Sequence, residues 1–165
     1  MSLLHIYDSS FRVTRWIAGR RGGADRHGVG SYTEFTALFT RLRDEGRSFD
    51  RILIESHGSP GRIGFGRSTL GPLTWRSMKQ AGYTGLARSG ARIHFNGCNV
   101  AEGPEGWEFL EAAADLFLNP GGGTVFGQTS LGFGNPVSGH VVHLWGETRS
   151  LFVGPDGRIL ERFEQ

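Results

Sequence analysis

Short apolar runs alternate along this chain with segments of helical spacing, and this alternation restricts the possible folds more than any other feature. The runs with the length of buried strands are residues 3–7, 50–56, 91–96 and 124–127. The segments with helical spacing are residues 31–44, 72–87 and 104–118. Strands that alternate with helices form a mainly parallel sheet with helices on both faces. The sequence therefore predicts an α/β domain of this architecture.

The predicted helices carry boundary signals. Ser31 can cap the first helix, and Glu34 completes a capping box. The apolar residues that share one face of this helix are Phe35, Leu38, Phe39 and Leu42. Pro104 suits the first turn of the last helix, because the N–H that proline lacks would be unbonded there in any case. The middle helix is expected to be interrupted or frayed near Gly82 and Gly85.

The remaining segments are less regular. Residues 11–17 alternate in hydrophobicity and predict a second strand. Residues 19–30 contain five glycines and predict an exposed loop, which lacks the Gly-Lys-Ser/Thr ending of a phosphate-binding loop. Residues 59–66 predict a turn and a short hairpin. The runs expected to form a β meander after these segments are residues 140–145, 150–153 and 158–163.

Composition limits the class of protein. A chain of 165 residues with 38% hydrophobic content predicts a single domain, residues 1–165, with an ordinary core. Its one cysteine excludes an intramolecular disulfide, and no run reaches the roughly 18 apolar residues of a membrane span. The first residues lack the basic and apolar pattern of a signal peptide. We therefore expect a cytoplasmic protein, and no motif asks for a cofactor.

The charge pattern disfavours a nucleic-acid partner. The formal net charge is +2, from 18 basic and 16 acidic residues. Seventeen of the basic residues are arginines, and they are scattered along the chain apart from a small group at Arg20, Arg21 and Arg26. A nucleic-acid binder is expected to concentrate its positive charge on one face or helix.

The residues that could carry chemistry lie where two apolar runs end. Residues 50–56 lead into His57-Gly58, and residues 91–96 lead into Gly97-Cys98. In an open α/β sheet, the loops at the carboxyl ends of the strands line the crevice that binds ligands. If the two runs are neighbouring strands, an imidazole and the only thiol of the chain emerge side by side. This pair favours a cysteine nucleophile with a histidine base.

The two motifs resemble those of the caspase-like (clan CD) cysteine peptidases, in which one apolar strand ends in His-Gly and a later one ends just before the catalytic cysteine. More narrowly, SHGSPG at residues 56–61 and GCNVA at residues 97–101 resemble a small bacterial caspase-like domain. The resemblance extends over residues 50–130. It implies a caspase-like three-layer sandwich in which the predicted helix 72–87 connects the two strands.

The resemblance also implies the roles of individual residues. Cys98 would be the nucleophile and His57 the general acid/base. The main-chain N–H groups of Gly58 and Cys98 would stabilise the oxyanion, a role that aligned donors perform well. A glycine after the histidine lets the backbone approach a substrate carbonyl closely. The implied activity is that of a cysteine endopeptidase acting on a polypeptide substrate.

The sequence leaves the substrate pocket open. Asn96 and Gly97 precede Cys98, so the Asp-Ser-Cys and Ala-Cys patterns of many active relatives are absent. The acidic residues that could reach the crevice and favour a basic substrate residue are Asp8, Glu55, Glu102 and Glu105. The resemblance points to the loop after the strand at 124–127 as a specificity segment, formed here by Gln128, Thr129 and Ser130.

Other functions compete with the peptidase. The same fold could be a catalytically inactive interaction domain that recruits a protein partner through the crevice or residues 19–30. A flavodoxin-like binder of a small ligand is a further alternative, because doubly wound sheets share the crevice. A metal site is not expected, since strand residues three apart, such as His140 and His143, point to opposite faces and no further ligands follow at zinc spacing.

Overall fold

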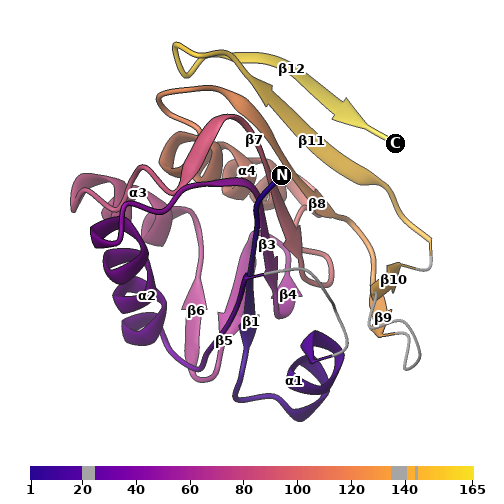
Figure 1. Cartoon of the computed structure of the whole chain (residues 1–165). Helices are drawn as coiled ribbons and strands as arrows, with labels where there is room; N and C mark the ends of the chain where they lie inside the picture. Colours follow the sequence, from indigo (N-terminus) through magenta and orange to yellow (C-terminus); the bar gives the residue numbers. More distant parts are fainter. Residues whose placement is uncertain (20–24, 135–140, 144) are drawn as a thin grey trace.

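A computed structural model describes residues 1–19, 25–134, 141–143 and 145–165 (Figure 1). The elements along the chain are β1 (Leu3–Asp8), α1 (Arg12–Ala18), β2 (Asp25–Val29), α2 (Tyr32–Asp44), β3 (Phe49–Glu55), β4 (His57–Ser59), β5 (Arg62–Phe65), β6 (Ser68–Leu70), α3 (Pro72–Gln80), β7 (Ala87–Asn96), α4 (Gly103–Phe117), β8 (Gly123–Gln128), β9 (Gly132–Gly134), β10 (Val141–His143), β11 (Thr148–Val153) and β12 (Ile159–Glu164).

A central sheet organises the molecule. Within the described residues it has seven strands in the order β12-β11-β8-β7-β3-β1-β2. The five strands β2, β1, β3, β7 and β8 pair in parallel in this order, whereas β11 pairs antiparallel with β8 and β12 pairs antiparallel with β11. The order of the parallel strands is that of flavodoxin-like doubly wound sheets. The prediction of an α/β domain with a mainly parallel sheet is thus confirmed.

The core lies on one face of this sheet, beneath α2, α3 and α4 (Figure 1). Alternate residues of the central strands point toward these helices and are fully buried, namely Leu4, Ile6, Ile54, Ile93 and Phe95. Trp75 of α3 is also fully buried, and its ring packs against those of Phe95 and Phe109. The direction of the chain accounts for this arrangement, because right-handed connections that step the same way across a sheet place their helices on the same face.

The opposite face has less cover. The step from β1 to β2 runs in the other direction, so α1 lies on this face, near the β9–β10 hairpin (Figure 1). The side chains of His5, Leu53 and Glu55 on this face are buried. Arg51 and Arg92, nearer the amino ends of their strands, are exposed. The elements that bury this face of the sheet therefore lie over the carboxyl ends of the strands.

The helix α2 begins as predicted. The hydroxyl of Ser31 accepts a hydrogen bond from the backbone N–H of Glu34 at 3.2 Å. The Glu34 carboxylate accepts from the backbone N–H of Gly30 at 2.7 Å, one residue before the expected capping-box partner. The predicted apolar residues Phe35, Leu38, Phe39 and Leu42 are all buried.

Replacing Ser31 with alanine is expected to destabilise the protein by about 1 kcal/mol, because the N-terminal turn of α2 loses its side-chain acceptor. Urea denaturation followed by circular dichroism measures this change in the free energy of unfolding. Thr33→Ala, at an exposed position in the same turn, is the matched control and should change stability by less than about 0.5 kcal/mol. Equal stability of the two variants would contradict the capping role.

Two predictions for the first part of the chain are wrong. Residues 11–17 were expected to form a strand but lie mostly in α1, where Thr14 and Ala18 are buried one helical turn apart. Residues 19–30 were expected to form a loop, yet β2 occupies much of this range and pairs in parallel with β1. A side chain at Gly28 would meet the ring of Tyr7 at 3.0 Å, so a glycine suits this strand. Residues 20–24 lie outside the described part.

The later elements differ from the prediction in their extent. The helix α3 ends at Gln80 rather than near residue 87, and Gly82 beyond it has a positive φ of 82°. Instead of one terminal meander, β9 and β10 form a separate hairpin while β11 and β12 extend the central sheet. The predicted strand 140–145 includes residues 140 and 144, which lie outside the described residues. Residues 59–66 form the turn and hairpin expected, within the small sheet β4-β5-β6.

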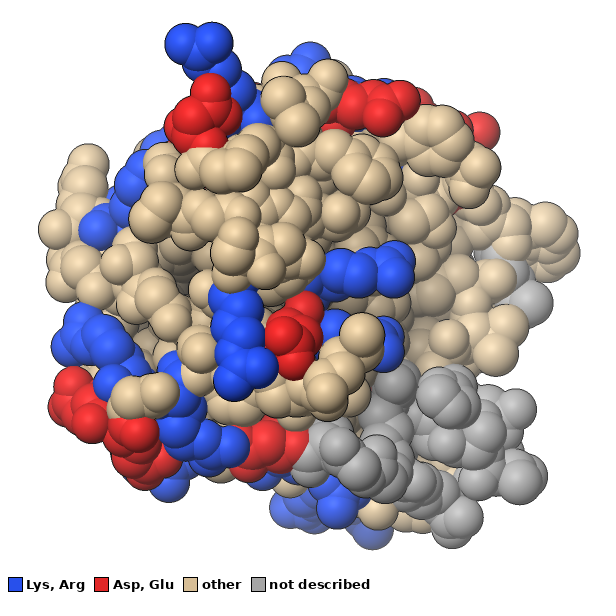
Figure 2. All heavy atoms as spheres, turned by 45° about the horizontal axis from the view of Figure 1, so that its top comes forward, with Lys and Arg blue, Asp and Glu red and all other residues tan. Residues whose placement is uncertain are grey.

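The surface carries mixed charge. On the face shown in Figure 2, basic and acidic side chains are interspersed. Several form ion pairs, such as Arg149 with Glu164 at 2.7 Å and Arg76 with Glu108 at 3.0 Å. Among the helices of the described residues, none combines the length and apolar character needed to cross a membrane.

Candidate active site

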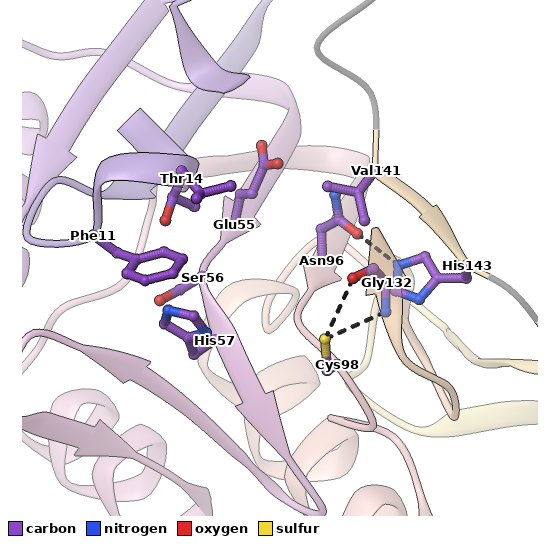
Figure 3. Close-up of a pocket in the computed structure, with 11 residues that line it drawn as sticks. Phe11, Thr14, Glu55, Ser56, His57, Asn96, Cys98, Gly132, Val141 and His143 are labelled. Atoms are coloured by element: carbon purple, nitrogen blue, oxygen red, sulfur yellow. Dashed lines mark hydrogen bonds between the residues drawn. The ribbon is translucent and has the colours of Figure 1, made fainter. Parts of the chain in front are cut away.

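The carboxyl ends of β3 and β7 meet at one pocket, with Glu55 and Asn96 opposite each other in the parallel pair. His57 follows β3 and Cys98 follows β7, and both line this pocket (Figure 3). Its empty space amounts to about 460 Å³, part of which opens to solvent. The residues lining it are Phe11, Val13, Thr14, Glu55, Ser56, His57, Asn96, Cys98, Gly132, Val141 and His143. The structure therefore brings together the imidazole and thiol that the sequence singled out.

The backbones that follow β3 and β7 are in direct contact. A Cβ atom added to Gly58 would lie 2.4 Å from the carbonyl oxygen of Cys98 and 2.8 Å from its nitrogen. A Cβ atom added to Gly97 would lie 3.2 Å from the Cα of Gly58. The glycine after His57 is thus required by the approach of the cysteine segment. The two N–H groups expected to bind an oxyanion belong to these adjoining segments.

The His57 side chain is exposed at the mouth of the pocket. The edge of its ring packs against Phe11, with the ring centroids 4.1 Å apart at 67°. Among the described residues, neither ring nitrogen of His57 has a hydrogen-bond partner, so both nitrogens are available to a proton donor or a substrate. Figure 3 shows His57 and Cys98 on opposite sides of the pocket, with the sulfur of Cys98 directed toward Gly132.

The sulfur of Cys98 contacts the β9–β10 hairpin. The backbone N–H of Gly132 donates a hydrogen bond to Sγ at 3.3 Å, and the thiol lies 3.9 Å from the Gly132 carbonyl oxygen (Figure 3). The side chain is half-buried. These contacts hold the sulfur at the wall of the pocket, within the space that His57 also borders.

A second histidine, which the sequence did not predict to be part of the site, lies in the same pocket. His143 places Nε2 2.9 Å from Oδ1 of Asn96 and Nδ1 3.3 Å from the carbonyl oxygen of Ser130. Burial lowers the pKa of His143 below its ordinary value, and the hydrogen bond to the Ser130 carbonyl raises it by a smaller amount. The ring is therefore neutral at neutral pH.

Glu55 is the acidic pocket candidate that lines the cavity. Its side chain is buried, and Oε2 lies 2.8 Å from Nε2 of the fully buried His5 on β1. Burial of a charged group requires such a partner. The contact between Glu55 and His5 links the pocket to the neighbouring strand β1.

Comparison with known protein families assigns the chain to one of them. Residues 27–119, more than half of the chain, match the model of a domain of unknown function, DUF4347. The chain belongs to the DUF4347 family. The match includes both His57 and Cys98, together with the strands that carry them. Neither the curated proteins nor the solved structures contain a match to this DUF4347 chain.

The other predicted pocket residues of this DUF4347 chain lie outside the lining of the cavity. The buried carboxylate of Asp8 instead accepts hydrogen bonds from the backbone N–H and the hydroxyl of Ser10, at 2.9 and 2.6 Å. Glu102 is exposed at the beginning of α4. Glu105 lines a separate hollow beside Gly61.

The predicted specificity residues Gln128, Thr129 and Ser130 form hydrogen bonds to neighbouring segments. The hydroxyl of Thr148 donates to the side chain of Gln128 at 3.2 Å. The hydroxyl of Thr129 accepts from the backbone N–H of Glu147 at 2.7 Å. The carbonyl of Ser130 accepts from the backbone N–H of Asn99 at 3.0 Å. Gly132, which lies two residues beyond this segment, is the residue that contacts Cys98.

Within the described ranges of this DUF4347 domain, no three His, Cys, Asp or Glu side chains lie close enough together to hold a metal ion. His94 stacks on Phe126 with the ring centroids 4.4 Å apart, and neither residue lines the pocket. The residues of the pocket suit acid–base and nucleophilic chemistry instead.

Proposed function

We propose that this DUF4347 domain is a cysteine endopeptidase of caspase-like architecture, with Cys98 as the nucleophile and His57 as the general acid/base. The observation that carries the proposal is the shared pocket, which His57 and Cys98 both line. The contact between the backbones of Gly58 and Cys98 supports it, because it fixes the spacing of the two strand ends.

The chemistry follows from the arrangement of these groups. His57 takes the proton of Cys98, and the thiolate attacks the carbonyl carbon of the scissile peptide bond. The N–H groups of Gly58 and Cys98 stabilise the resulting oxyanion. His57 then gives its proton to the leaving amine, and a water molecule that His57 deprotonates hydrolyses the thioester. A hydrogen bond between the two side chains is expected to form when substrate binds.

A polypeptide substrate suits the surroundings of the pocket. Phe11 and Val13 of the pocket lining are 41% and 50% exposed. Exposed apolar groups that gather around a cavity mark a binding surface. We further propose that the domain acts in a reducing compartment such as the cytoplasm, where a catalytic thiol stays reduced.

The test is the rate at which iodoacetamide alkylates Cys98 between pH 5 and 9, followed by cleavage of a fluorogenic peptide library. Wild type should react fast well below the pH at which an ordinary thiol ionises. His57→Ala should slow peptide cleavage about 10²-fold, because it removes the proton carrier. His27→Ala, on the edge strand β2, is the matched control and should react as wild type does.

An inactive interaction domain is the second candidate. The hydrogen bonds of the Cys98 sulfur within the described residues go to Gly132 and not to His57, and the apolar surroundings of the pocket suit a bound protein as well as a substrate. Two results together would contradict the peptidase proposal and favour this alternative. One is slow alkylation of Cys98 at the same rate in wild type and His57→Ala, and the other is no cleavage of any library peptide.

A further inference from the structure

Each ring nitrogen of the second histidine of the pocket lies within hydrogen-bond distance of an oxygen, and the neutral ring donates to one of the two through its single N–H. His143 lies opposite Gly132 in the β9–β10 pair, and its ring bridges Asn96 at the end of β7 and the carbonyl of Ser130. Because both nitrogens already face these oxygens, His143 is poorly placed to take the proton of Cys98. Its role must therefore differ from that of His57, whose nitrogens are available.

The contacts of the hairpin converge on the cysteine. The N–H of Gly132 donates to Sγ of Cys98 at 3.3 Å, while the N–H of Asn99 donates to the carbonyl of Ser130 at 3.0 Å. A Cβ atom at Gly132 would lie 2.9 Å from Cε1 of His143, so the ring packs directly on the residue that contacts the sulfur. The ring thus ties the hairpin to β7 next to Cys98.

We infer that His143 is a positioning residue, which holds the β9–β10 hairpin on Asn96 and thereby keeps the N–H of Gly132 on the sulfur of Cys98. The catalytic consequence rests on the proposed function. If Cys98 is the nucleophile, its sulfur must be aimed at the substrate carbonyl, and a small misplacement costs rate. The docking of the hairpin itself does not depend on peptidase activity.

Acid should weaken this docking. Because burial lowers the pKa of His143 in the docked hairpin, the ring binds a proton more readily once it is free in solvent. The stabilisation is therefore complete above the ordinary histidine pKa of about 6.5 and is lost as the pH falls through the lowered value. The titratable groups that share the pocket with His143 are Glu55, His57 and Cys98.

The test measures hydrogen exchange of the Gly132 amide by NMR, expressed as protection relative to an unstructured peptide at each pH. We expect His143→Ala to lower this protection about tenfold at pH 7.5, because the contacts to Asn96 and Ser130 are lost. His143→Gln, which can still hydrogen-bond Asn96, should keep more of the protection. In His143→Gln the protection of the Gly132 amide should not fall as the pH is lowered, whereas in wild type it should.

Val142→Ala is the matched control, since its half-exposed side chain belongs to the same strand but does not line the pocket. The protection of the Gly132 amide in Val142→Ala should equal that in wild type at every pH. Gly132 protection that is unchanged in His143→Ala, or that falls with acid equally in His143→Gln, would overturn the inference. A wild-type protein that shows the expected protection but cleaves no peptide would retain the positioning role and contradict the peptidase proposal instead.

Discussion

Replacing Gly58 with alanine is expected to destabilise the protein by about 3 kcal/mol and to slow the reactions of Cys98 about 10²-fold. The added Cβ atom would lie 2.4 Å from the carbonyl oxygen of Cys98, a backbone atom that no side-chain rotation can move aside. The strand ends must therefore separate. Alanine also restricts the unfolded chain, but this gain of at most about 1 kcal/mol is smaller than the cost.

The control for this substitution is Gly64→Ala. Gly64 pairs with His57 in the same small sheet, but the nearest atom to a Cβ placed there is 3.8 Å away. This variant should stay close to wild type in the free energy of unfolding and in the rate of alkylation. If Gly58→Ala were as stable and as reactive as Gly64→Ala, the close approach of the two strand ends would be wrong.

Replacing Trp75 with alanine is expected to lower the free energy of unfolding by about 3–5 kcal/mol. The side chain is fully buried between α3, α4 and the sheet, and its ring contacts Phe35, Phe95 and Phe109 with centroids 5.6–6.0 Å apart. Truncation removes this packing and leaves a cavity that the surrounding aromatic rings fill only in part. Urea denaturation measures the loss as a lower midpoint at unchanged slope.

Two companion variants sharpen the comparison. Leu73→Ala, on the same helix but 75% exposed, should change stability by less than about 0.5 kcal/mol. Trp75→Phe should be milder than Trp75→Ala, because it keeps an aromatic ring and removes an indole N–H that has no hydrogen-bond partner among the described residues. A loss below about 1 kcal/mol in Trp75→Ala would contradict the central place of this ring in the core.

The strands that carry the site could be predicted because their signals are local. A short, mainly apolar run is typical of a buried strand, and such a strand must be followed by a loop at the edge of the sheet. The motifs His57-Gly58 and Gly97-Cys98 were therefore expected at the same edge, where the structure places them. The cap at Ser31 was predictable for the same reason, since its partner is three residues away.

The elements that could not be predicted depend on distant partners. A short segment such as residues 11–17 shows too few turns to separate the two periodicities, and its burial against β1 decides the outcome. The strand β2 is rich in polar residues and gains its hydrogen bonds only by joining the edge of the sheet.

The pocket residues Gly132 and His143 were missed because the hairpin register brings them to Cys98, and a short strand does not specify its register. One signal was present in the sequence, namely His143 within the apolar run 140–145. The spacing of His143 from His140 argues only against a shared metal ion. A polar residue in an otherwise apolar strand could instead have suggested a buried hydrogen-bonding partner.

The contact between Gly58 and Cys98 has a consequence for the time at which the protein becomes reactive during synthesis. It joins two strand ends with a small sheet and α3 between them in sequence, and the sulfur receives its last contact from the hairpin that follows β8. A growing chain emerges from its amino end at about 5–20 residues per second. The thiol of a nascent chain therefore stays unaligned until the hairpin has left the ribosome, so a peptidase of this design would be inert while the residues that precede the hairpin are being made.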